Sequence, residues 1–181
     1  MDSQQIKTTV IFTDGSGEDY TKGKDIHAGT GIFFGDGDPR NVSTPFVIYP
    51  ITHNRAEIYG VIKTVEIMAA KIINTDPLQK LVIYSDSQYV VKSINEWMDG
   101  WKKKGWKKAD KKPVENMDLW YWLDKLMQMY ANRFQYEIHW MPSHENPPKA
   151  AKDSQEYIQW YGNMMADKFA KAGRDASRLL K

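Results

Sequence analysis

Four acidic side chains lie where the predicted buried elements of the chain begin or end. Asp14 follows a short apolar run, Asp86 follows another, Glu57 lies in the first turn of an amphipathic stretch, and Asp167 lies in the last such stretch. Two carboxylates ~5 Å apart repel by roughly 3 kcal/mol at an effective dielectric of about 20, so four of them cannot cluster cheaply without cations. Oxygen ligands without cysteine or histidine suit Mg²⁺, with Mn²⁺ as a substitute, better than zinc. Two such ions ~4 Å apart would activate a water and stabilise the leaving oxygen of a phosphodiester.

These acids meet only if the strands before Asp14 and Asp86 are neighbours in one sheet. Ligands bind outside the carboxyl ends of strands in open α/β sheets, so both acids would then emerge at one edge. Asn163 lies four residues before Asp167 and shares its helix face. The alternative for Glu57 and Asp86 is a helix-capping role, because helix N-termini favour anions. Taken singly, capping is the commoner role; taken together beside a basic segment, the acids favour a metal site.

Hydrophobic periodicity predicts the elements that position the acids. Short β-branched or alternating runs predict strands at residues 9–12, 31–34, 43–51, 80–84 and 134–140. Apolar residues at helical spacing predict helices at residues 54–73, 85–97, from 113 onward, and 162–172. We expect Asn54 with Glu57 to cap the first helix and Gly173 to end the last. The order βββαβααβα indicates one α/β domain over residues 1–181, with its core at 7–174 and a frayed tail at 175–181.

Length and composition limit the class of protein. The chain has 181 residues, of which 41% are hydrophobic and 27% charged, as is typical of one globular domain rather than a disordered chain. No apolar stretch approaches ~18 residues and the first residues lack a signal-peptide core, so we expect an intracellular protein without a membrane span. The absence of cysteine excludes disulfides and thiolate metal sites. A monomer is the default expectation.

Positive charge is concentrated in residues 100–112, which we call the basic segment. It carries seven lysines and one acid, a net charge of +6, in a chain whose total is only +2, so the other residues sum to −4. Such a patch suggests a polyanionic partner; the alternative is a solvated helix face.

Five runs resemble, in residues and in order, the type 1 ribonucleases H, enzymes that cleave the RNA strand of RNA–DNA hybrids. Four runs contain the acids: FTDGS at 12–16, NRAE at 54–57, YSDSQYV at 84–90 and NMMAD at 163–167. The fifth comprises WKKKGWK at 101–107, ADKKPV at 109–114 and DLW at 118–120, and it resembles the basic protrusion of the bacterial-type enzymes. The resemblance extends from about residue 9 to residue 173.

The resemblance implies a ribonuclease H-like α/β fold, with a five-stranded mixed sheet flanked by helices. It also implies a two-metal-ion reaction that leaves 5′-phosphate and 3′-hydroxyl ends, with the four acids as metal ligands. His144 matches a mobile-loop histidine thought to move protons and help release product. Thr52 matches a position that binds a DNA phosphate, and Asn54 and Gln88 match positions that contact the RNA strand.

The basic segment and the last helix supply the other substrate-binding candidates. These are Trp101, Lys102, Lys103, Lys104, Trp106, Lys107 and Asn163. The lysines would hold the DNA backbone of the hybrid, and each phosphate neutralised should contribute about −0.9 to the slope of log affinity against log salt. The two tryptophans would either pack on sugars or anchor the segment, and we favour anchoring.

Two departures from the family pattern affect predicted contacts. Residues 18–24 replace a turn that contacts RNA in the family, so that contact cannot be assigned. His53 replaces a common asparagine, and we give it, like His27 and His139, no role beyond structure.

A third departure is an insertion at residues 145–162, near the predicted active site. Residues 153–156 predict the start of a short helix within it. The aromatic residues that follow are Tyr157, Trp160 and Tyr161. We expect them to pack on the body of the protein rather than to form a lid or a nucleic-acid contact.

Two other functions are compatible with these features. The first is a non-catalytic module that binds hybrid or duplex RNA, and the retention of all four acids and His144 counts against it. The second is another nuclease or strand transferase of the same fold, and the basic segment together with Gln88 favours the ribonuclease instead.

Overall fold

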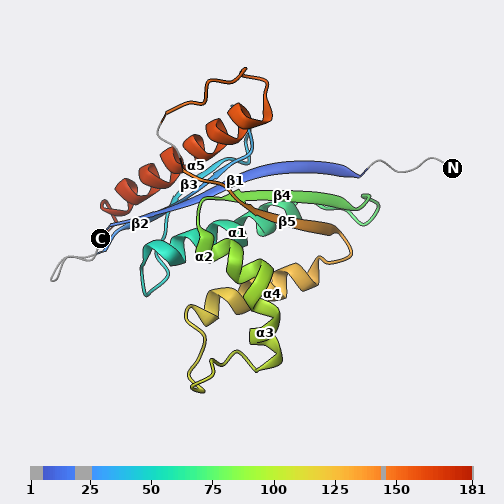
Figure 1. The fold of residues 1–181 in the computed structure, drawn as a ribbon, viewed down its shortest axis with the longest axis vertical. Helices are drawn as coiled ribbons and strands as arrows, with labels where there is room; N and C mark the ends of the chain where they lie inside the picture. Colours follow the sequence, from blue (N-terminus) through green and yellow to red (C-terminus); the bar gives the residue numbers. More distant parts are fainter. Residues whose placement is uncertain (1–5, 19–25, 144–145, 181) are drawn as a thin grey trace.

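Five strands form one mixed sheet in the order β3-β2-β1-β4-β5 in the computed structural model, which describes residues 6–18, 26–143 and 146–180 (Figure 1). The strands are β1 (Lys7–Gly17), β2 (Ala28–Phe33), β3 (Val42–Pro45), β4 (Gln79–Ser85) and β5 (Phe134–Trp140). The first three form an antiparallel meander, whereas β4 and β5 run parallel to β1. The predicted five-stranded mixed sheet is therefore confirmed.

The central strand β1 pairs with β4 and β2 over different parts of its length. It pairs with β4 as far as Thr13 and Ser85, and with β2 from Phe12 to Gly17. The prediction that this strand ends before Asp14 is wrong, because the pairing with β2 extends it. Asp14 and Asp86 nevertheless follow the last residue pair that β1 and β4 share, so they emerge at one edge as predicted.

Helices cover both faces of the sheet (Figure 1). They are α1 (His53–Ala69), α2 (Gln88–Lys92), a π-helical turn (Ser93–Trp97), α3 (Met98–Lys103), α4 (Met117–Met129) and α5 (Gln155–Ser177). Alternate strand residues point to opposite faces, so Ile11 of β1 joins the core beneath α1 and α4, and Phe12 joins a second cluster beneath α5. None of the helices in the described ranges is both long enough and apolar enough to cross a membrane.

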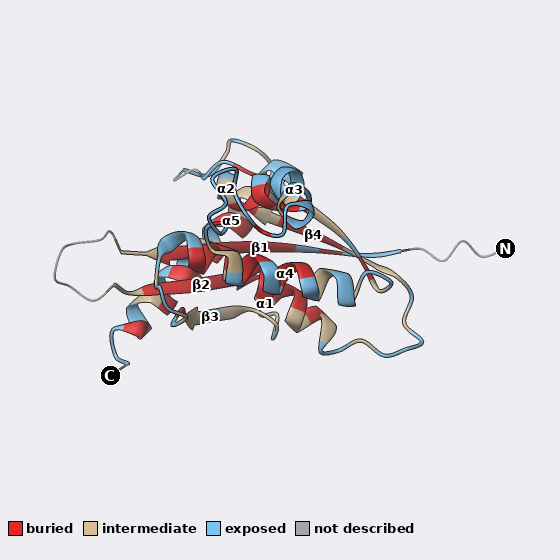
Figure 2. Cartoon of the chain, turned by 90° about the horizontal axis from the view of Figure 1, so that it is seen from below, coloured by how far each residue is buried: buried red, intermediate tan, exposed pale blue. Residues whose placement is uncertain are grey.

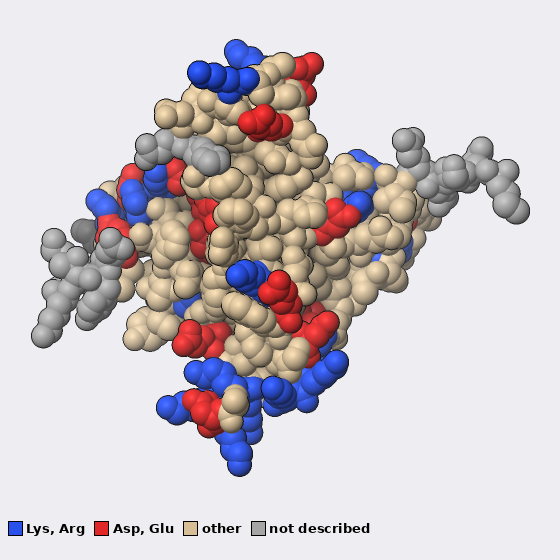
Figure 3. Space-filling view, viewed as in Figure 1, with Lys and Arg blue, Asp and Glu red and all other residues tan. Residues whose placement is uncertain are grey.

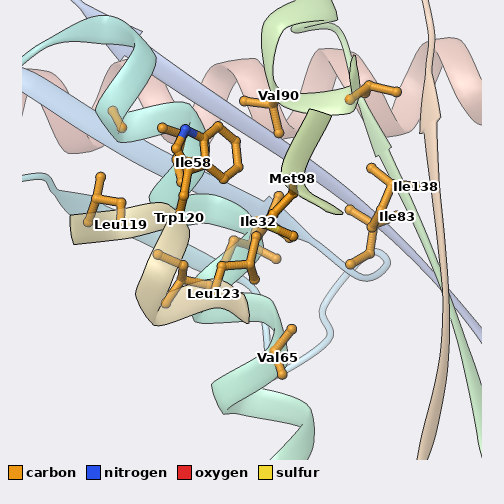
Figure 4. Close-up of a cluster of buried hydrophobic side chains, with 14 of the residues drawn as sticks. Ile32, Ile58, Val65, Ile83, Val90, Met98, Leu119, Trp120, Leu123 and Ile138 are labelled. Atoms are coloured by element: carbon orange, nitrogen blue, oxygen red, sulfur yellow. The ribbon is translucent and has the colours of Figure 1, made fainter. Parts of the chain in front are cut away.

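The larger core lies between the sheet, α1 and α4. Figure 4 shows side chains of these helices, among them Ile58 and Trp120, gathered over the sheet residues Ile32 and Ile83. Burial extends along most of β1 and β2 (Figure 2). Rigid elements packed on both sides therefore carry the end of β1 that holds Asp14.

Helix α1 begins earlier and ends earlier than its periodicity predicts. Its N-cap is Thr52, whose Oγ1 accepts a hydrogen bond from the Arg55 N–H at 3.1 Å. The prediction that Asn54 caps this helix with Glu57 is therefore wrong, and Glu57 lies beyond the first turn. A threonine hydroxyl satisfies a free N–H at a helix start as an asparagine side chain does, and the backbone places Thr52 in that position.

The helical region after β4 is longer than predicted and is interrupted differently. It continues through the π-helical turn, which ends at Trp97, into α3, which ends at Lys103 within the basic segment. The next helix, α4, does not begin near Pro113, which instead forms an isolated β-bridge with Lys107. The chain reaches α4 through Asn116, whose left-handed backbone (φ 58°) forms the N-cap.

Helix α5 extends beyond the predicted 162–172 at both ends. It starts after the N-cap Ser154, so the short helix predicted in the insertion is in fact the first part of α5. The prediction that Gly173 ends the helix is wrong: a Cβ there would lie 2.3 Å from the Thr44 carbonyl oxygen, so glycine permits close packing on β3. The predicted frayed tail begins too early, because α5 continues to Ser177.

Candidate active site

Three of the four predicted acids converge at the edge where β4 ends. Asp14 of β1, Glu57 of α1 and Asp86 after β4 each place one carboxylate oxygen within 4.8 Å of the others. Asp14 and Glu57 are almost completely buried, at 3% and 2% exposure, and Asp86 is partly buried. Two strands and one helix therefore bring together acids that lie 72 residues apart in the sequence, from 14 to 86.

Gly15 permits the close approach of α1 to β1 that brings Glu57 to Asp14. A Cβ on Gly15 would lie 2.5 Å from the backbone nitrogen of Glu57, closer than real side chains approach. Helix α1 can therefore rest directly on β1 only because residue 15 has no side chain. The Gly15 N–H also donates to Asp14 Oδ1 at 2.9 Å, which orients that carboxylate.

The helix-capping alternative is wrong for both acids to which it applied. The cap of α1 is Thr52, and the cap of α2 is Ser87, whose hydroxyl accepts from the Val90 N–H. Glu57 and Asp86 thus do not owe their positions to a helix end. Their carboxylates instead face one another.

Burial and mutual repulsion make the charged forms of these acids unfavourable. Burial, followed by repulsion from Glu57, raises the pKa of Asp14 well above its usual range. Burial, followed by repulsion from Asp86, raises the pKa of Glu57 to about 8. Glu57 Oε2 is also buried without a hydrogen-bond partner. An all-oxygen donor set with excess negative charge and an unused oxygen fits a hard divalent cation such as Mg²⁺.

The fourth predicted acid, Asp167, stands outside this close group. It lies near enough on α5 for its charge to raise the pKa of Asp14, Glu57 and Asp86. Its own carboxylate forms an ion pair at 2.9 Å with Lys171, one helical turn later, and is 39% exposed. The ion pair with Lys171 thus competes with the predicted approach of Asp167 to the other three acids.

Two side chains support Asp86 from other elements. The buried Asn163 of α5 donates from Nδ2 to Asp86 Oδ2 at 3.3 Å. Trp140, at the end of β5, donates from its indole nitrogen to the Asp86 carbonyl oxygen at 3.0 Å. We predicted Asn163 as a substrate contact, whereas its observed partner is a carboxylate of the site.

His53 is a second residue of this site, besides Trp140, for which the sequence predicted no functional role. Its Nε2 lies 3.2 Å from Glu57 Oε1, and its Nδ1 accepts from the Gly17 N–H at 3.1 Å. The spacing of four residues before Glu57 was the available signal, because such residues share a helix face.

The residues predicted to contact RNA and DNA lie at the starts of α1 and α2, close in sequence to the acids. Thr52 and Asn54 are exposed at the start of α1, and Gln88 is exposed as the first residue of α2. Their positions beside Glu57 and Asp86 are compatible with contacts to a bound strand, which stay predictions.

The basic segment forms one end of the molecule, where Figure 3 shows a group of lysine side chains over α3 and the following loop. Its lysines are exposed. Lys102 differs from the rest, because its Nζ lies 3.0 Å from the buried carboxylate of Asp124. Its predicted role in substrate binding therefore competes with a structural one.

The two tryptophans of the basic segment belong to an aromatic cluster. Trp106 is buried and lies 5.8 Å from the ring of Tyr121, and Trp101 lies 6.0 Å from Trp120. These contacts attach the segment to α4, as the anchoring interpretation predicts.

Some predictions fall on residues outside the described ranges. His144 is one of them, so its catalytic role stays a prediction, and most of residues 18–24 are others. Within the insertion, Tyr161 packs edge-on against Phe33 at 5.8 Å and parallel to Tyr157 at 6.4 Å. The expected packing of the aromatic residues on the body is confirmed for Tyr161.

Comparison with known proteins identifies related sequences. A sequence model of the family described as RNase H matches residues 6–175. The chain is 35% identical over 170 residues to the Ribonuclease H of Nitrosomonas eutropha, an alignment that covers 93% of this chain and 90% of that protein. It is 37% identical over 143 residues to the Ribonuclease H of Dechloromonas aromatica, covering 79% and 86%.

Solved structures share the same architecture. The solution structure of the PFV RNase H domain matches with a TM-score of 0.64 at 26% identity, covering 95% of this chain and 97% of that one. The crystal structure of LC9-RNase H1, described as a type 1 RNase H with the type 2 active-site motif, matches with a TM-score of 0.67 at 18% identity, covering 96% and 74%. The second likeness concerns the fold alone.

Proposed function

Because this chain belongs to the ribonuclease H family, whose members are hydrolases that act on nucleic acids, we propose that it cuts the RNA strand of RNA–DNA hybrids at the site of Asp14, Glu57 and Asp86. The observation that carries the proposal is the convergence of three acids, two of them buried, within 4.8 Å. Such a group is costly unless cations neutralise it.

Asp14, Glu57 and Asp86 are the residues that would hold divalent metal, and Asp167 is the candidate for a fourth ligand. Two Mg²⁺ ions, for which Mn²⁺ could substitute, would neutralise the acids, activate the attacking water and stabilise the leaving oxygen. Asn163 keeps the Asp86 carboxylate oriented through its hydrogen bond. We expect cleavage to leave 5′-phosphate and 3′-hydroxyl ends.

Recognition of the hybrid requires contacts that differ between its strands. The exposed amides of Asn54 and Gln88 can both donate to and accept from a 2′-hydroxyl, which only the RNA strand carries. Thr52 lies two residues before Asn54, and the basic segment offers exposed lysines to the phosphates of the DNA strand. Polar side chains suited to the RNA strand thus lie near the acids, and a separate positive surface is suited to the DNA strand.

The test is a labelled RNA–DNA hybrid incubated with Mg²⁺ and either the wild type or Asp14→Asn. We expect the variant to abolish cleavage while hybrid binding in Ca²⁺ persists, because the amide removes a charged ligand but little volume. Glu156→Gln, which changes an exposed acid on α5, is the matched control and should cleave normally.

Product ends give a second readout. Treatment of the RNA fragments with phosphatase should shift the mobility of the downstream fragment alone, since that fragment carries the 5′-phosphate. Normal turnover by Asp14→Asn, or cleavage that persists in EDTA, would show that the acids do not act through metal.

A further inference from the structure

The imidazole of His53 bridges the end of β1 and the carboxylate of Glu57. Its Nδ1 lies 3.1 Å from the Gly17 backbone nitrogen, and its Nε2 lies 3.2 Å from Glu57 Oε1. His53 is the first residue of α1, and Glu57 lies one helical turn later on the same face. One ring therefore contacts both of the elements that carry Asp14 and Glu57.

The two contacts determine which nitrogen carries the proton. A backbone N–H can only donate, so Nδ1 must accept from Gly17 and is unprotonated. The ring proton is then on Nε2, which donates to Glu57 Oε1. The neutral imidazole thus acts as a directed hydrogen-bond donor to a candidate metal ligand.

This donor leaves the other oxygen of the same carboxylate available. Glu57 Oε2 is buried and has no hydrogen-bond partner. With Oε1 held by His53, the carboxylate can turn only if that hydrogen bond breaks. Carboxylates that bind metal are commonly held in this way by a neighbouring donor, and loss of such a donor typically lowers metal affinity about 10–100-fold.

We propose that His53 is a positioning residue, which holds Glu57 through its Nε2–H and thereby sets the affinity of the site for Mg²⁺. The inference rests on the proposed metal-dependent function and extends it to a residue outside the four acids. The contact with Gly17 orients the ring, and the contact with Glu57 performs the positioning.

Two substitutions separate these contacts. The amide of His53→Asn reaches about as far as Nδ1, so it can accept from Gly17 but cannot reach Glu57. The amide of His53→Gln reaches about as far as Nε2, so it can still donate to Glu57. The two variants therefore distinguish the donor to Glu57 from the link to β1.

The measurement is Mg²⁺ binding by isothermal titration calorimetry in the absence of nucleic acid, with thermal unfolding in EDTA alongside. We expect His53→Asn to raise the Mg²⁺ Kd about tenfold and His53→Gln to stay near the wild type. In cleavage assays, excess Mg²⁺ should restore much of the kcat lost by His53→Asn.

His139→Asn is the matched control, because His139 Nε2 also contacts a carboxylate, Glu137 Oε2 at 3.1 Å, on the exposed surface of β5. Its Mg²⁺ Kd should equal that of the wild type. Unchanged Mg²⁺ affinity in His53→Asn, or an equal loss in His53→Gln, overturns the role of His53 while leaving the proposed function intact. A wild type that binds no Mg²⁺ overturns the proposed function itself.

Discussion

Asn163 and Asp86 are joined by a hydrogen bond of 3.3 Å between α5 and the end of β4, across 77 positions of sequence. The amide lies at 5% exposure, so water cannot easily replace it. Asp86 therefore depends on a helix that packs on the opposite face of the sheet from α1, the helix that carries Glu57. The site is held from both faces of the sheet.

Replacing Asn163 should affect catalysis more than stability. We expect Asn163→Ala to lower kcat about tenfold, within the 10–100-fold typical when a ligand loses its hydrogen-bond partner. Asn163→Asp should lower kcat further, because it adds a like charge beside Asp86. Steady-state kinetics at saturating Mg²⁺ measure both effects. Asn95→Ala, which removes a 2.9 Å bond to the Ile138 carbonyl away from the acids, should leave kcat unchanged.

The raised carboxyl pKa values predict how stability depends on pH without metal. In EDTA the folded state binds more protons than the unfolded state between the ordinary carboxyl pKa, about 4, and the Glu57 pKa of about 8. The free energy of unfolding should therefore fall as pH rises through this window. Mg²⁺ should reverse the loss, because it binds the deprotonated acids.

Asp14→Asn removes one of the coupled charges and should weaken this pH dependence. Urea unfolding of both proteins at several pH values from 5 to 8 in EDTA makes the comparison. A difference in stability between wild type and variant that stays constant across this range would contradict the charge repulsion that we infer.

The lysines of the basic segment should separate into two classes. Lys103→Ala and Lys104→Ala should weaken hybrid binding and reduce the salt slope by up to about 0.9 each, because their exposed charges can neutralise phosphates. Lys102→Ala should instead lower the free energy of unfolding by about 1–3 kcal/mol, since buried Asp124 loses a partner. Fluorescence anisotropy across salt concentrations and urea unfolding measure the two effects. Equal salt slopes in the wild type and Lys104→Ala would mean that Lys104 does not reach phosphate.

An ion pair between α1 and α4 should respond unequally to loss of its two members. Arg55 donates to both oxygens of Asp118 at 2.7 Å, and Arg55 is 2% exposed whereas Asp118 is 58% exposed. Asp118→Ala leaves a buried charge and should cost about 3 kcal/mol. Arg55→Met leaves an exposed carboxylate and fills a similar volume, so it should cost less. Denaturant unfolding ranks the variants, and the reverse order would refute this account.

Glycine 15 should tolerate no side chain. Gly15→Ala would place Cβ 2.5 Å from the Glu57 backbone nitrogen, which forces α1 away from β1 and separates Glu57 from Asp14. We expect loss of both thermal stability and Mg²⁺ binding. Gly100→Ala is the control: it lies in α3 with open space around it and should stabilise the protein by about 0.5–1 kcal/mol. Normal Mg²⁺ affinity in Gly15→Ala would show that α1 can move without disturbing the site.

Much of the fold could be predicted from local patterns. The strand at Phe134–Trp140 has the predicted bounds, because apolar and polar residues alternate along it in the sequence. Helix ends were predicted less well where two residues compete for one role. Thr52 and Asn54 can each cap a helix, and Gly173 suits either a helix end or a close contact. The role of Gly173 is decided by β3, because α5 packs closely against that strand.

The sequence by itself determined the order of the elements, the identity of the candidate acids and the concentration of lysines, since these depend on residue type and spacing. Only the tertiary structure decided which acids meet. Asp14, Glu57 and Asp86 converge because β1 and β4 are parallel neighbours and Gly15 admits α1. Asp167 pairs with Lys171 instead, and His53 becomes part of the site because Gly17 lies beside it. Contacts between distant segments depend on packing in three dimensions, which local sequence patterns do not predict.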